Sequence, residues 1–230
     1  TTTPGYRTIV RNNISHDNAT GPSVAGNHTD GNGIIIDDFR STQDPNYPSY
    51  DFPTLVENNV AFNNGGKGIH VTWSDNVTVR NNTVWHNNWD NLNSGTWRGE
   101  LSNQEGSNNI WINNIAVANF ATNPNNTAIG NYSSSNYVNQ NTIWLNNLTF
   151  NGVPGDPSFR VTGINAAPRL ADGNLLGIDP QFIDPAGADF RLLLGQNYSN
   201  RKDRGERRRR QSKFPHGNPS ENSFVENNKA

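Results

Sequence analysis

The fold is decided by a five-residue pattern that first appears as Val10-Arg11-Asn12-Asn13-Ile14: an apolar residue, any residue, two asparagines, then an apolar residue or threonine. The pattern returns with the first asparagine of each pair at Asn58, Asn81, Asn113 and Asn146. Successive pairs are 46, 23, 32 and 33 residues apart. Repeats of this size are typical of solenoids, in which each unit buries its apolar face by stacking on its neighbours.

Short β-type runs of three to five residues flank these pairs, and turn residues separate them. Helix-period runs are absent, which argues against helical repeats such as ankyrin. The chain also contains 41 asparagines, and stacked turns offer asparagine both left-handed backbone positions and side-chain ladders. The pattern therefore predicts an all-β fold, a right-handed parallel β-helix, with the five pairs in equivalent turns. We interpret the first spacing as two coils, one without the pair, and the longer ones as a coil plus an inserted loop.

The pattern ends near residue 150, which divides the chain into three segments. We expect β-helix coils over residues 1–150 and an irregular closing segment, packed on the solenoid, over residues 151–196. Residues 197–230 contain the like-charge block Arg201–Arg210, which predicts a basic tail that is disordered or non-native. The formal charge is −7 over residues 1–200 and +5 over residues 201–230.

Composition excludes several classes of protein. The absence of cysteine excludes a disulfide scaffold, a thiolate metal site and a cysteine nucleophile. No stretch approaches the roughly 20 apolar residues of a membrane span. Because Thr1 is not a natural start, we expect that a signal peptide was removed and that the protein is extracellular or periplasmic. We expect no nucleic-acid partner, and the sequence does not indicate an oligomeric state.

Several stretches resemble bacterial right-handed parallel β-helix proteins of the pectate-lyase-like superfamily. They are His28–Asp38, Asn63–Val71, Trp97–Glu100 and Asp179–Phe182. The superfamily contains polysaccharide lyases, glycoside hydrolases and uncharacterised repeat proteins. The resemblance therefore implies the fold and a carbohydrate polymer as ligand, while the reaction has to be argued from the site.

Strand alternation predicts one exposed polar strip across neighbouring coils. If Ile34, Ile69 and Leu101 point inward, polar residues between inward positions point outward. The strip would consist of Asp37, His70, Arg98 and Glu100, with Asp30, Asp38 and Lys67 at its edges. A slip of one residue in register would reverse every facing.

The aspartates of this strip suggest a metal site. Asp30, Asp37 and Asp38 offer several carboxylate oxygens, which suit Ca²⁺. A bridging Ca²⁺ would neutralise a uronate carboxylate and acidify the C5 proton. The plainer alternative is that Asp37-Asp38 caps a turn after a strand.

The cations of the strip suggest β-elimination. This reaction needs a base near C5, and lysine or arginine has that role in many β-helix lyases. Lys67 lies between two glycines, and nearby cations such as Arg98 would lower its pKa. We expect His70 to bind the ligand from its outward position.

Hydrolysis is the alternative reaction. The stretches His28–Gly31, Asp37-Asp38 and Gly66–Gly68 are similar to motifs of polygalacturonase-type hydrolases, with Lys67 in place of their histidine. A carboxylate pair such as Asp37 and Glu100 would then act as acid and base.

Aromatic side chains and an amide complete the expected cleft. Trp73, Trp89 and Trp97 offer faces on which sugar rings stack, and we expect Asn32 to bind substrate. Our first hypothesis is a polysaccharide lyase acting on uronic-acid chains. The alternatives are a glycoside hydrolase on the same fold and a non-catalytic, glycan-binding solenoid.

Overall fold

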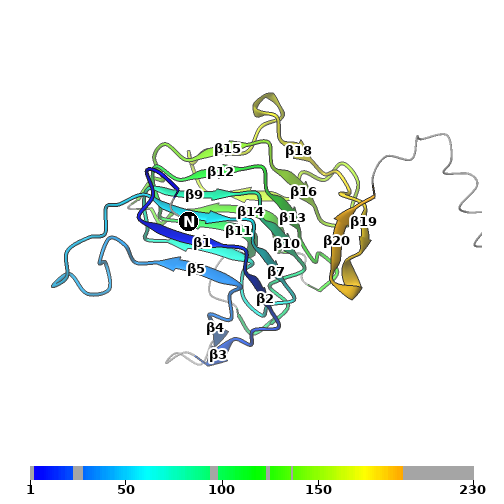
Figure 1. Ribbon diagram of the computed structural model, residues 1–230, viewed down its shortest axis with the longest axis horizontal. Helices are drawn as coiled ribbons and strands as arrows, with labels where there is room; N and C mark the ends of the chain where they lie inside the picture. Colours follow the sequence, from blue (N-terminus) through cyan, green and yellow to red (C-terminus); the bar gives the residue numbers. More distant parts are fainter. Residues whose placement is uncertain (1–2, 23–27, 94–97, 123–124, 136, 194–230) are drawn as a thin grey trace, which may run out of the picture.

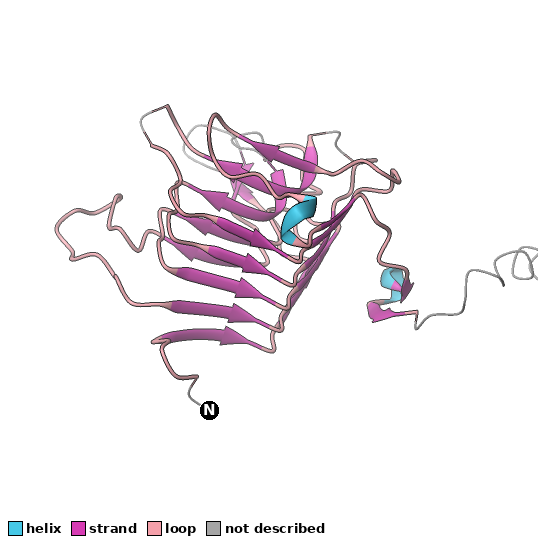
Figure 2. Ribbon diagram, turned by 90° about the horizontal axis from the view of Figure 1, so that it is seen from above, coloured by secondary structure: helices cyan, strands magenta, loops and turns pink. Residues whose placement is uncertain are grey.

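A computed structural model describes residues 3–22, 28–93, 98–122, 125–135 and 137–193. Most strands belong to three parallel β-sheets, which form the sides of a stack of coils, as Figures 1 and 2 show. Each complete coil contributes one strand to each sheet, so the predicted parallel β-helix is confirmed. Among the described residues, no helix is long and apolar enough to cross a membrane.

The first sheet contains the strands that precede the asparagine pairs. These are β1 (Thr8–Arg11), β6 (Thr54–Glu57), β9 (Val77–Arg80), β12 (Ile110–Ile112) and β15 (Ile143–Leu145). The second sheet follows the pairs and contains β2 (Ile14–His16), β7 (Val60–Phe62), β10 (Thr83–Trp85), β13 (Ile115–Val117), β16 (Leu148–Phe150) and β18 (Leu175–Leu176).

The third sheet completes each coil. It contains β5 (Ile34–Asp37), β8 (Ile69–Thr72), β11 (Arg98–Gln104), β14 (Asn126–Tyr132) and β17 (Phe159–Val161). Two antiparallel hairpins lie outside the three sheets: β3 (Gly21–Pro22) with β4 (His28–Thr29), and β19 (Phe182–Asp184) with β20 (Asp189–Leu192). The short 3₁₀ turns Leu170–Asp172 and Pro185–Gly187 are the only helical segments in the described part of the chain.

The asparagine pairs form the corner between the first two sheets. The first asparagine of every pair has a left-handed backbone, with φ between 52° and 58°, in the positions Asn12, Asn58, Asn81, Asn113 and Asn146. This conformation is costly for most residues but accessible to asparagine. The prediction that these residues occupy equivalent turns is confirmed.

The second asparagine of each pair points inward and forms a ladder. Each Nδ2 donates to the Oδ1 of the next coil, over distances of 2.9 to 3.2 Å, in the order Asn13, Asn59, Asn82, Asn114 and Asn147, and the ladder ends on Asn174, which follows Gly173 and accepts from Asn147. Each described ladder rung therefore satisfies a buried amide by joining two coils. The Asn ladder inferred from composition is confirmed.

The interpretation of the 46-residue spacing is wrong. Strand β1 pairs directly with β6, and Thr8 lies opposite Thr54, so no coil lies between the first two pairs. The first coil is instead lengthened by the β3–β4 hairpin and by a loop after β5. Insertions lengthened one coil until it had the size of two.

The interior of the solenoid is lined by stacked aliphatic and aromatic side chains. The core includes Ile36, Ile69, Val71, Leu101 and Ile129 from the third sheet, together with the stacked pair Trp111 and Trp144. At the outer face of the second sheet, Phe190 of β20 contacts Phe62 and Trp85, with ring centroids 5.3 and 5.9 Å apart. Residues 194–230, which include the predicted basic tail, lie outside the described residues.

Candidate functional site

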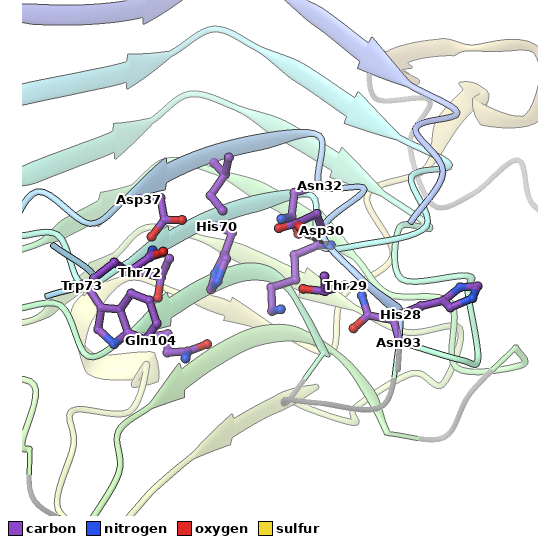
Figure 3. Close-up of a pocket in the computed structure, with 13 residues that line it drawn as sticks. His28, Thr29, Asp30, Asn32, Asp37, His70, Thr72, Trp73, Asn93 and Gln104 are labelled. Carbon is purple, nitrogen blue, oxygen red and sulfur yellow. Dashed lines mark hydrogen bonds between the residues drawn. The ribbon is translucent and has the colours of Figure 1, made fainter. Parts of the chain in front are cut away.

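A cavity of about 500 Å³ lies over the outer face of the third sheet (Figure 3). Six predicted site residues line it: Asp30, Asn32, Asp37, Lys67, His70 and Trp73. They come from the first two coils, so the stacking of coils brings together residues that are up to 43 positions apart in the sequence.

Strand register explains which side chains reach the cavity. His70 lies opposite Ile35 and Ser102, while Thr72 lies opposite Asp37 and Gln104. Because these positions alternate with the core residues, their side chains share the outer face. The outward facing predicted for Asp37 and His70 is therefore correct.

Lys67 is held by the turn that leads into β8. Its backbone N–H donates to the Asn32 side-chain oxygen, at 2.8 Å, and Gly66 N–H donates to the Gly31 carbonyl, at 2.9 Å. A Cβ on Gly66 would lie 2.0 Å from the Asp30 carbonyl oxygen, so this position requires glycine. The predicted substrate residue Asn32 thus positions Lys67 through its backbone.

His70 is buried and neutral. Only 5% of the residue is exposed, and its Nδ1 lies 3.1 Å from the Ser102 hydroxyl. Burial, followed by the positive charge of Lys67, holds the pKa of His70 well below its ordinary value. The imidazole is therefore a neutral group that lies beside a cation, available as a proton acceptor at neutral pH.

The pKa of Asp37 is shifted in the opposite direction, above its ordinary value. Burial raises its pKa first, and the negative charges of Asp38 and Asp30 raise it further. Asp37 therefore retains a proton to higher pH than an ordinary aspartate does. The effect of Asp30 on this pKa also means that the two carboxylates are close enough to influence each other.

Trp73 lies at one end of the cavity, next to Asp37 and Gln104 (Figure 3). It adopts a left-handed backbone, with φ 46°, at the corner after β8. Its indole Nε1 donates to the Glu105 carboxylate, at 2.8 Å, and Glu105 also accepts from the Ser134 backbone N–H, at 3.0 Å. The indole is thus fixed in place by a residue of the next coil.

The prediction that Glu100 lies on the exposed polar strip is wrong. Glu100 is fully buried and accepts a hydrogen bond from the Asn87 amide, at 2.5 Å, inside the solenoid. The strand register makes Gly33 and Gly68 its equivalents in the preceding coils. A Cβ on either glycine would lie within 3.0 Å of the side-chain amide of an asparagine inside the solenoid. A side chain at this corner position therefore points inward. The next residue, Leu101, also points inward, so strict alternation does not hold here. A Glu100–Asp37 acid/base couple is therefore excluded.

The other predicted residues of this region divide into three cases. Arg98 begins β11, where its backbone is the register equivalent of Gly66, and its side chain lies outside what the structure describes. The residues of β11 beside His70 and Thr72 are Ser102 and Gln104. Trp97 lies outside the described residues. Trp89 is 43% exposed, donates to the Asn63 carbonyl and does not line the cavity.

Asp38 points into its own loop and not toward the cavity. Its carboxylate accepts hydrogen bonds from the Thr42 N–H, at 2.6 Å, from the Thr42 hydroxyl and from the Gln43 N–H, at 3.0 Å. Although burial works against ionisation, these bonds lower the pKa of Asp38. Within the described ranges, no group of three or more acidic or histidine side chains is arranged to hold a metal ion. Asp30, Asp37 and Asp38 thus do not form a ready-made calcium site.

Several lining residues were missed by sequence reasoning. Thr72 follows from the same strand alternation as His70 but was not chosen as a site residue, and Gln104 follows from the register of β11, which its strand pattern did not reveal. His28, Thr29 and Gln43 come from the hairpin and loop inserted in the first coil, where no repeat predicts their position. Comparison of the chain with protein-family models, curated proteins and solved structures found no match.

Proposed function

We propose that this chain binds and cleaves an extracellular polysaccharide containing uronic acid, by β-elimination, in the cavity over the third sheet. We also propose that it belongs to the pectate-lyase-like superfamily, which the parallel β-helix fold and the Asn ladder support. The observation that carries the proposal is that Lys67, neutral His70 and Asp37 line the same cavity.

Each of the three groups suits one requirement of β-elimination. The ammonium group of Lys67 attracts the uronate carboxylate and stabilises the negative charge that develops on it. Neutral His70 accepts the C5 proton, which forms the C4=C5 double bond as the C4–O4 bond breaks. Asp37, whose pKa is raised, donates a proton to the leaving O4. Atoms and charge balance, because one proton is taken and one is supplied.

The proposal changes one assignment of the sequence analysis. The sequence predicts lysine as the base, whereas in this proposal His70, which burial and Lys67 keep neutral, takes the proton and Lys67 remains the cation. Trp73 remains a stacking surface for a sugar ring. A Ca²⁺ ion stays part of the proposal: the Asp30 carboxylate, the substrate's own carboxylate and water would hold it, and it would neutralise the uronate charge while Asp37 keeps its proton.

The test measures two products from pectate, alginate and xylan. A lyase yields an unsaturated sugar that absorbs ultraviolet light, together with new reducing ends, whereas a hydrolase yields reducing ends alone. We expect ultraviolet absorbance on a uronate polymer, and a loss of kcat of about 10²- to 10⁴-fold in His70→Gln. His86→Gln, at a partly buried histidine directly after β10, is the matched control and should retain activity. Wild-type absorbance that persists in His70→Gln would exclude His70 as the base.

The second candidate is a glycoside hydrolase, supported by the coupling between Asp30 and Asp37. A carboxyl with a raised pKa beside an ionised partner is the arrangement that acid and base catalysis requires. In this case reducing ends appear without ultraviolet absorbance, and both Asp30→Asn and Asp37→Asn are severe. Retention of a polymer without either product would favour the non-catalytic binding solenoid.

A further inference from the structure

The described residues that line the cavity distribute their charge unevenly. One of them is a lysine, Lys67, and none is an arginine. Lys67 lies in the turn before β8, whereas Trp73 directly follows this strand, whose four residues span roughly 13 Å. Figure 3 shows Asp37, Thr72, Trp73 and Gln104 together at the Trp73 end of the cavity. A cation is therefore available to a ligand at one end of β8 and not at the other.

The Trp73 end presents an aromatic ring beside a neutral amide. Gln104 of β11 lies opposite Thr72, so its side chain is on the outer face, next to the indole (Figure 3). Gln104 is half-buried, and within the described part of the chain its amide makes no hydrogen bond. An aromatic face buries the C–H groups of a sugar ring, and an amide both donates to and accepts from hydroxyl groups. The chemistry of this end therefore matches an uncharged sugar.

The indole is held by charged residues that lie behind it. Glu105 accepts the indole N–H and also meets the positive charge of Arg40, whose guanidinium donates to the Glu105 carbonyl. The guanidinium carbon of Arg40 lies 4.2 Å from the centre of the Tyr137 ring, and the Arg40 backbone N–H donates to the Trp73 carbonyl, at 3.0 Å. Neither Glu105 nor Arg40 lines the cavity. They are positioning residues, which hold Trp73 without offering a charge to the ligand.

The proposed reaction places the departing sugar at this end. Asp37, the proposed acid, donates to the leaving O4, and Asp37 lies at the Trp73 end of the cavity (Figure 3). In a uronate chain, O4 joins the reacting uronate to the preceding sugar, which departs when the C4–O4 bond breaks. The chemistry requires no carboxylate on that sugar. A carboxylate at this end would lose water without gaining a charged partner.

We propose that Trp73 and Gln104 form the subsite for the departing sugar and that they favour an uncharged ring. The preferred substrate is then a chain in which a neutral sugar is attached to O4 of the uronate, and not a homopolymer of uronic acid. The inference rests on the proposed function, because it takes the direction of the chain from the proton donor Asp37.

The test compares two polymers of galacturonate by the ultraviolet absorbance of the unsaturated product. In polygalacturonate the sugar on O4 is another galacturonate, whereas in the alternating galacturonate–rhamnose backbone of pectin it is a neutral rhamnose. The assay uses about 150 mM NaCl, which screens the charge of −7 on residues 1–200. For the wild type, kcat/KM should be about tenfold higher on the alternating chain, because the departing ring carries no carboxylate to desolvate.

Gln104→Lys tests the selectivity directly. The new ammonium group can bind a carboxylate on the departing ring, so kcat/KM on polygalacturonate should rise about tenfold relative to the alternating chain, the effect of one hydrogen bond to a charged group. The ratio of the two values cancels any effect of the new charge on Asp37. Trp73→Ala should lower kcat/KM about tenfold on both polymers, because either ring loses its stacking surface.

A matched control separates a local charge from a general one. Gln140 is exposed and does not line the cavity, so Gln140→Lys adds the same charge elsewhere and should leave the ratio unchanged. Equal kcat/KM on the two polymers in the wild type, or the same ratio in Gln104→Lys as in Gln140→Lys, would overturn the inference and leave the proposed function in place. Gln104→Lys decides the matter even if Trp73→Ala disturbs the corner after β8. Absence of unsaturated product from both polymers would overturn the proposed function and this inference with it.

Discussion

The side chain of His70 illustrates how one residue obtains its chemistry from its neighbours. Its pKa is lowered by burial and by Lys67, so removing the lysine charge should raise it. We predict that Lys67→Gln shifts the His70 titration to higher pH, measured by NMR of the imidazole. His86 is the internal control, because burial alone lowers its pKa to about 4. A His70 titration that does not move in Lys67→Gln would mean that the two groups are not coupled.

Glu100 is the second residue whose environment has a measurable consequence. Burial raises its pKa to about 8 from 4.5, and one carboxyl oxygen has no hydrogen-bond partner among the described residues. The unfolded chain therefore releases this proton at lower pH than the folded chain does. The free energy of unfolding should fall as pH rises from about 4.5 to about 8, by on the order of a few kcal/mol.

The variant Glu100→Gln isolates this contribution. It keeps the size and the hydrogen-bonding groups of the side chain but cannot ionise. We predict that denaturant unfolding between pH 5 and 9 shows wild-type stability falling relative to Glu100→Gln as pH rises. Parallel curves for the two proteins would show that Glu100 does not titrate in this range.

At the level of elements, the two asparagines of each pair have different tasks. Asn113 has φ 56° and is exposed, whereas Asn114 is buried and donates to the Val79 carbonyl and to Asn147. We predict that Asn113→Gly changes stability by less than about 1 kcal/mol, because glycine accepts this backbone. Asn114→Ala leaves buried partners unsatisfied and should cost roughly 2–4 kcal/mol in urea unfolding. Equal costs would contradict this division of tasks.

The asparagine pair also explains which parts of the fold the sequence could and could not predict. The asparagine pair has a fixed place relative to two strands, so the first corner of five coils was identified from the residues alone, whereas the corner at Gly173-Asn174, which lacks the pair, was not. The third sheet has no such marker before its strands. Its register depends on where the chain turns after an insertion, and the inward corner shared by Gly33, Gly68 and Glu100 is visible only once the coils are stacked. For that reason Asp37, Lys67 and His70 were predicted correctly as neighbours and Glu100 was not.

For the whole molecule, net charge should govern how the cavity meets an acidic polymer. Residues 1–200 carry a formal charge of −7, which repels a polyuronate at long range, whereas Lys67 attracts it locally. Because salt screens exposed charges over a Debye length of about 10 Å at 0.1 M, added salt weakens the repulsion more than it weakens the buried contact. We predict that oligogalacturonate binds more tightly at 200 mM than at 20 mM NaCl, measured by calorimetry. CaCl₂ at matched ionic strength should tighten binding further than NaCl does, through the oxygens that Asp30 and the ligand share, and Asp30→Asn should remove that difference. Weaker binding at high salt would mean that local attraction outweighs the charge of −7 on residues 1–200. Equal effects of the two salts would leave screening as the only role for calcium.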